Sequence, residues 1–132
     1  MADLSSHFTG WMQDECRRLE ELSRRAAAQP ADTAVLEQLY RAAHDIKGEA
    51  GTFGYPVIER ITASLSRLMS RAPDRAQVPL PLIERHVAAV RRALAIDRDG
   101  EALAGELESA TAQFLREAMK AYPEVKSPPL AP

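Results

Sequence analysis

Apolar residues recur along this chain at spacings of three and four, which is the period of an amphipathic α-helix. The pattern appears five times, and each time a proline, a glycine or a polar cluster ends it. No stretch shows the sustained alternation that a half-buried strand needs. The sequence therefore predicts an all-α protein.

The first predicted helix runs from about Ser6 to Ala28, and the second runs from a cap at Asp32 or Thr33 to Gly54. The third runs from Pro56 to just before Pro73. The fourth begins at Pro79 and Pro81 and ends at the polar stretch 97–100, and the fifth runs from there to about Met119. The second helix has an apolar stripe made of Leu36, Leu39, Ala43, Ile46, Ala50 and Phe53. Because such stripes must be buried against one another and the connections are short, we expect an antiparallel, up-and-down bundle. Its core should be a four-helix bundle, with five helices in total.

Chain length and composition narrow the class of protein further. A chain of 132 residues has room for one domain, and we assign residues 1–121 to the bundle. Residues 122–132 are rich in proline and should form a disordered tail. With 17 Lys and Arg against 19 Asp and Glu, the net charge of -2 gives no electrostatic case for binding nucleic acid.

The amino-terminal region and the single cysteine suggest where the protein acts. Charged residues interrupt every apolar run in the first 30 residues, so we expect neither a signal peptide nor a membrane span, and a cytoplasmic protein. Cys16 has no partner for an internal disulfide and should be a small buried residue. His7 and His86 show no ligand spacing with Cys16 or with each other, so no metal site is expected, and we read both histidines as surface or packing residues.

One segment of the second helix has glycines where a helix built for stability would not. Gly48 and Gly51 each cost about 1 kcal/mol relative to alanine in a helix interior. At 100° per residue, His44 and Gly48 lie away from the apolar stripe, with Lys47 and Gly51 flanking them. The face therefore presents an imidazole, an ammonium and bare backbone that another protein could approach. The alternative is that the glycines serve packing between helices.

These residue types suit phosphoryl transfer. The ordinary pKa of imidazole, about 6.5, leaves a neutral nucleophilic nitrogen at physiological pH, so His44 could accept a phosphoryl group. Lys47 could stabilise the charge on the phosphoryl oxygens. A lone histidine on a helix is usually a solvated or structural residue. Here, however, a docking face for a phosphoryl-transfer partner explains the positions of the histidine, the lysine and the two glycines together.

The stretch Ala42-Ala43-His44-Asp45-Ile46-Lys47-Gly48-Glu49-Ala50-Gly51-Thr52-Phe53-Gly54 resembles the histidine phosphotransfer (HPt) family. It looks most like the phosphotransfer domain of chemotaxis-type histidine kinases. The resemblance implies that His44 is phosphorylated on its outer ring nitrogen, that Lys47 assists, and that Tyr40, Arg41, Gly48 and Gly51 contact the partner. The glutamate that commonly orients the histidine in chemotaxis-type domains is replaced here by Ser66, which becomes a candidate partner of the imidazole.

The resemblance also implies partners and a role. The partners would be the receiver domain of a response regulator and a histidine kinase or hybrid kinase, with Mg²⁺ coming from the receiver and no cofactor of the chain's own. We expect a monomeric phosphocarrier, not an autonomous enzyme, that exchanges a phosphoryl group with a receiver aspartate in a two-component phosphorelay. The alternatives are a helical module that binds a receiver or kinase without being phosphorylated, as an inhibitor or adaptor would, a domain excised from a kinase, and a metal-binding bundle.

Overall fold

The computed structural model describes residues 2–30, 32–95 and 100–121, with side chains from residue 10 to residue 120 within those ranges. The described residues form helices and no strands, which confirms the predicted all-α class. The elements are α1 (Ala2–Ala28), α2 (Thr33–Phe53), α3 (Pro56–Arg71), a short 3₁₀ helix η1 (Arg75–Gln77), α4 (Leu80–Ala95) and α5 (Gly100–Ala121). The predicted tail, residues 122–132, and most of the polar break at 97–100 lie outside the described residues.

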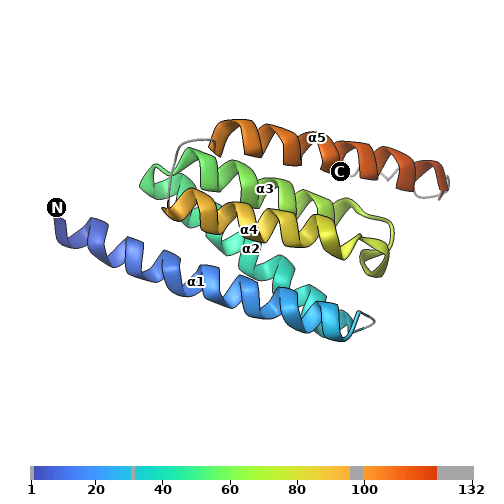
Figure 1. The fold of residues 1–132 in the computed structure, drawn as a ribbon, viewed down its shortest axis with the longest axis horizontal. Coiled ribbons are helices and arrows are strands. Elements are labelled where there is room, and N and C mark those ends of the chain that lie inside the picture. The colour runs from blue at the N-terminus through green and yellow to red at the C-terminus, as the bar shows by residue number, and fades with distance from the viewer. Residues whose placement is uncertain (1, 31, 96–99, 122–132) are drawn as a thin grey trace, which may run out of the picture.

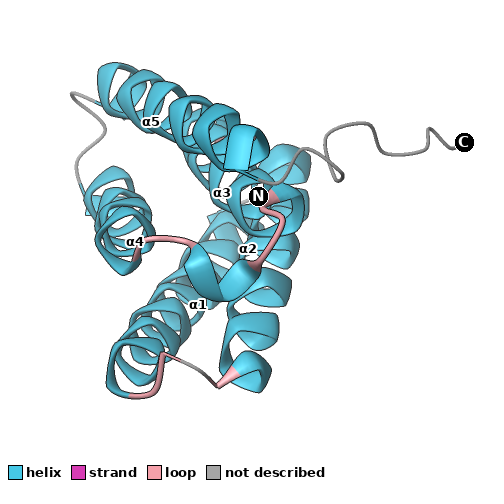
Figure 2. Ribbon diagram, turned by 90° about the vertical axis from the view of Figure 1, so that its right-hand side faces the viewer, coloured by secondary structure: helices cyan, strands magenta, loops and turns pink. Residues whose placement is uncertain are grey.

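The first four α-helices form an antiparallel bundle, and the fifth packs onto one side of it (Figure 1). Within the bundle, α1 packs against α2 and α4, and α3 packs against the same two helices. Helix α5 lies across α3 and α4, far from α1 (Figure 2). The predicted up-and-down bundle with five long helices is therefore confirmed.

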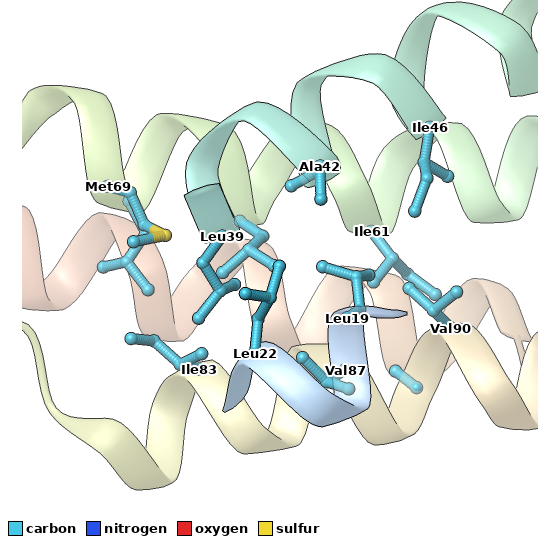
Figure 3. Packing of buried hydrophobic residues seen from close by; sticks show 14 of the residues in the cluster. Leu19, Leu22, Leu39, Ala42, Ile46, Ile61, Met69, Ile83, Val87 and Val90 are labelled. Atoms are coloured by element: carbon cyan, nitrogen blue, oxygen red, sulfur yellow. The ribbon is translucent and has the colours of Figure 1, made fainter. Parts of the chain in front are cut away.

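The core lies where the apolar stripes of α1–α4 meet. Figure 3 shows Leu22 from α1 beside Leu39 of α2, and Leu19 from α1 beside Ile61 of α3, with Ile83 of α4 in the same buried cluster. Leu19, Leu39 and Ile83 are fully buried, and Leu22 is 3% exposed. Burying a leucine or isoleucine side chain stabilises the fold by about 1.5–3 kcal/mol, so this shared core holds the helices in place. Cys16 is buried among these residues, as predicted.

Two details of the predicted helices are wrong. Helix α1 begins at Ala2, a turn earlier than the expected start at Ser6, because neither glycine nor proline interrupts the sequence before Gly10. Phe53, which we expected in the apolar stripe of α2, is 40% exposed. It is the last residue of α2 and therefore lies at the end of the bundle, where the neighbouring helices no longer cover it.

A tight connection turns the chain from α2 into α3. Gly54 has φ +79°, a left-handed conformation that glycine adopts without steric cost, and its N–H donates to the Ala50 carbonyl. The Tyr55 N–H donates to the same carbonyl at 2.9 Å, and Pro56 then begins α3. Because the connection is so short, α3 returns directly alongside α2.

The longer connection between α3 and α4 folds back onto α2. The Asp74 side chain accepts a hydrogen bond from the Ala76 N–H at 3.0 Å and caps η1. The Val78 N–H donates to the Arg75 carbonyl at 3.2 Å and closes the turn. Helix η1 packs against α2, and this brings Arg75 close to the outward face of that helix.

A buried polar cluster joins α3, α4 and α5. His86 is fully buried, and its Nδ1 lies 2.8 Å from the Leu82 carbonyl, which can only accept, so Nδ1 carries the proton. The unprotonated Nε2 then accepts from the Ser64 hydroxyl at 2.8 Å, and Thr111 Oγ1 lies 3.0 Å from that hydroxyl. Burial lowers the pKa of His86 to about 4, against the opposing effect of the Leu82 hydrogen bond. His86 is therefore a neutral packing residue, one of the roles expected for it; the His7 side chain lies outside the described residues.

Candidate functional site

The candidate site is the outward face of α2. The Asp32 side chain caps the helix by accepting from the Ala34 and Val35 N–H groups, and the buried stripe fixes how the helix is rotated about its axis. The opposite face consequently points away from the core. It carries the residues that the sequence singled out at spacings of three and four, namely Tyr40, Arg41, His44, Lys47, Gly48 and Gly51.

His44 lies at the centre of this face with its side chain exposed. Its ring contacts the ring of Tyr40, one turn earlier, with 6.0 Å between the ring centroids and a 44° angle between the planes. No hydrogen bond or ion pair joins His44 to another residue in the described ranges. Both ring nitrogens are thus available to a reagent or partner, and the imidazole has the Tyr40 ring as its neighbour on the same helix.

Tyr40 is itself held by a residue that the sequence analysis missed. The guanidinium carbon of Arg75 lies 4.9 Å from the centre of the Tyr40 ring, within the range of a cation–π contact. Arg75 Nε donates to the Met69 carbonyl at 2.9 Å, and Nη1 donates to Glu37 at 2.5 Å. Arg75 lies in the connection after α3, and no helical periodicity links it to α2, so only the folded structure reveals this contact.

Glu37 receives a second hydrogen bond from the same face of α2. Arg41, which is exposed, donates from Nε to Glu37 at 2.9 Å. The hydrogen bonds from Arg75 and then from Arg41 hold the pKa of the Glu37 carboxyl below its ordinary value. Arg41 and Tyr40 are therefore both tied to one carboxylate at the edge of the site.

Lys47 and Gly48 lie beside His44 on its other side. Lys47 is half-buried and forms no ion pair with another described residue, so its ammonium is free to meet an incoming anion. A Cβ added at Gly48 would meet no atom of the described residues within 4 Å. Nothing packed around Gly48 thus requires a glycine there, and the helix carries its cost without an internal structural reason.

Gly51 differs from Gly48. A Cβ at Gly51 would lie 2.9 Å from a carboxylate oxygen of Glu59, a residue in the first turn of α3. The Glu59 side chain therefore extends over the bare backbone of Gly51. The space at Gly48 is open, whereas the space at Gly51 is occupied by a flexible carboxylate of the same chain.

Ser66 does not form the hydrogen bond to His44 that the sequence analysis considered. The side chain is 6% exposed, and Oγ has no hydrogen-bond partner among the described residues. The Gly51–Glu59 contact sets the register of the two antiparallel helices, and two turns farther along it places Ser66 at the level of His44. The short serine side chain remains covered while the imidazole extends outward, so the bond is absent.

Charges around His44 differ between its two sides. Toward α1, Asp45 lies near Glu15, whose carboxyl pKa is raised by burial, with Asp45 adding to the increase and Arg18 opposing it. Lys47 and Arg41 provide positive charge on the outward face. No group of three or more His, Cys, Asp or Glu residues is clustered as metal ligands in the described part of the chain.

The described residues thus form an antiparallel helical bundle whose second helix exposes a histidine beside a lysine and a bare patch of backbone. The family model described as Hpt domain matches residues 3–124, and the chain belongs to this family. Hpt domains are phosphocarrier modules that transfer phosphoryl groups through a histidine in two-component phosphorelays, and they interact with kinases and response regulators. Comparison with curated proteins and with solved structures gave no match. None of the described helices is long and apolar enough to cross a membrane.

Proposed function

We propose that His44 exchanges a phosphoryl group with the aspartate of a response-regulator receiver domain. His44 accepts the group from a phosphorylated aspartate and can return it to an unphosphorylated one. The observation that carries the proposal is the exposed imidazole of His44 beside Lys47 and the open backbone of Gly48. A histidine or hybrid kinase is the other partner that such a relay requires. The direction of flow depends on which partner is phosphorylated.

The chemistry needs only the imidazole and a positioned donor. The lone pair of the outer ring nitrogen, Nε2, attacks the phosphorus atom of the aspartyl phosphate. An N–P bond forms as the acyl phosphate P–O bond breaks, the aspartate leaves as a carboxylate, and the Nδ1 proton passes to water. Lys47 stabilises negative charge on the phosphoryl oxygens, and the receiver supplies Mg²⁺.

Docking would use the same face of α2. A receiver must bring its acidic pocket within bonding distance of Nε2, and a side chain at Gly48 would stand in its way. Arg41 is exposed one turn before His44 and can contact acidic groups of the partner. The Glu59 carboxylate over Gly51 is flexible enough to move aside when the partner approaches.

Radiolabelled transfer from a phosphorylated receiver tests this proposal. The purified chain should acquire label that is lost in acid and retained in base, because phosphohistidine has that stability and an aspartyl phosphate does not. If the chain binds the receiver tightly but acquires no label, it is instead a non-phosphorylated adaptor or inhibitor. If it neither binds nor acquires label from any receiver tested, the proposal is wrong.

A further inference from the structure

We propose that Tyr40, held in place by Arg75, orients the His44 ring for phosphoryl transfer, so that both are positioning residues. The inference rests on the proposed role of His44 as the phosphoryl acceptor. It extends the site beyond α2 to the connection between α3 and α4, where Arg75 lies. Tyr40 and Arg75 would then both contribute to the reaction itself. This role is additional to the partner contact expected of Tyr40 and to the packing of Arg75.

The His44 ring has few constraints other than Tyr40. Its side chain is exposed, and no described residue donates or accepts a hydrogen bond at either ring nitrogen. Ser66, which lies at the same level on α3, leaves its Oγ without a partner instead of bonding to the ring. The tilted contact at 6.0 Å between the Tyr40 and His44 rings is therefore the interaction that restricts how His44 rotates.

Tyr40 can restrict His44 only if Tyr40 is itself fixed, and Arg75 fixes it. The Tyr40 ring is half-buried, with the Arg75 guanidinium 4.9 Å from its centre. That guanidinium is anchored by hydrogen bonds to the Met69 carbonyl and the Glu37 carboxylate, and the Arg75 side chain is only 29% exposed. A cation bound at these points forms a rigid support, unlike a solvated arginine.

A series of contacts links the connection between α3 and α4 to the His44 ring nitrogen that attacks phosphorus. Arg75 is anchored to α2 and α3, it contacts Tyr40, and Tyr40 contacts His44. An oriented imidazole loses less rotational freedom when it reaches the transition state, so fixing the ring raises the rate of attack on phosphorus. Loss of either support should slow His44 phosphorylation even when no partner protein has to dock.

Phosphoramidate, a small chemical donor that needs no docking surface, tests the inference on the full chain. Tyr40→Leu and Arg75→Gln should each slow phosphorylation of His44 by about threefold to tenfold. Tyr40→Phe keeps the aromatic ring and should largely restore the rate. The matched control is Arg60→Gln, which removes another partly buried arginine that bridges two helices, to Glu108 at 2.7 and 3.1 Å, but touches neither Tyr40 nor His44.

NMR of the His44 ring separates this inference from the proposed function. Arg75→Gln should shift the His44 ring resonances and weaken the contacts between the His44 and Tyr40 rings, whereas Arg60→Gln should do neither. If wild type is phosphorylated and both Tyr40→Leu and Arg75→Gln react at the wild-type rate, the positioning role is wrong and the function stands. If wild type is not phosphorylated at all, the function fails, and the positioning role that rests on it fails with it. Unchanged ring resonances in Arg75→Gln would overturn the positioning role even if wild type is phosphorylated.

Discussion

The Glu59 carboxylate lies 2.9 Å from the position that a Cβ on Gly51 would occupy, so the two glycines of the site have different surroundings. Gly51 leaves room for a side chain of its own protein, while the space at Gly48 is empty. A packing explanation can therefore account for Gly51 but not for Gly48. If Gly48 leaves room for a partner protein, replacing it with a larger residue should stabilise the fold and weaken docking.

Gly48→Leu tests that separation. The substitution should raise the free energy of unfolding by about 0.5–1 kcal/mol, because leucine has the higher helix propensity and no atom obstructs its Cβ. It should also weaken receiver binding by about tenfold, or 1.4 kcal/mol, because the side chain fills the docking space. Gly10→Leu on α1 is the control, since a Cβ there is equally unobstructed. Unchanged receiver affinity in Gly48→Leu would remove the docking explanation.

Lys47→Ala should slow phosphoryl transfer while leaving receiver binding nearly intact. The substitution removes the positive charge next to His44 but little of the docking surface, and the expected loss is on the order of tenfold or more in rate. Rapid-quench transfer kinetics and a binding titration measure the two effects separately. Lys120→Ala on α5 is the charge-matched control. A wild-type rate for Lys47→Ala would mean that Lys47 is only a solvated lysine.

The buried His86 should make the fold sensitive to mild acid. Its pKa in the folded protein is about 4, below the ordinary 6.5, so folding favours the neutral ring. This contribution is fully present above pH 6.5 and is lost as the pH falls from 6.5 toward 4, by about 3 kcal/mol in total. Denaturant unfolding across this range should show the decrease, and His86→Gln should remove most of it. An equal decrease in His86→Gln would assign the acid sensitivity to the carboxylates.

Ser66→Glu should raise the pKa of His44 above that of the wild-type protein. The helix register places position 66 at the level of the imidazole, and a longer, charged side chain there could reach the ring and favour its protonated form. NMR titration of the His44 ring measures the change, with Ser109→Glu on α5 as the control for added charge. If the His44 pKa does not rise, a charge at position 66 does not interact with the His44 ring.

The sequence predicted the elements of the fold well because each helix has its own period and its own end signals. Gly54 ends α2 and Pro56 begins α3, as expected. It also predicted the outward face, because His44 and Gly48 follow from helix geometry alone. Contacts between helices could not be predicted in the same way. Arg75 over Tyr40, Glu59 over Gly51 and the unbonded Ser66 all depend on tertiary packing, which periodicity does not encode.

The most direct test of the central claim is the intact mass of wild type and His44→Gln after incubation with a phosphorylated receiver. The exposed His44 side chain contributes little to folding, so His44→Gln should retain its helicity and its free energy of unfolding within about 0.5 kcal/mol. Wild type should gain the mass of one phosphoryl group, which disappears in acid, and His44→Gln should gain none. A phosphorylated His44→Gln, or a wild-type chain that carries the group on another residue, would contradict the account.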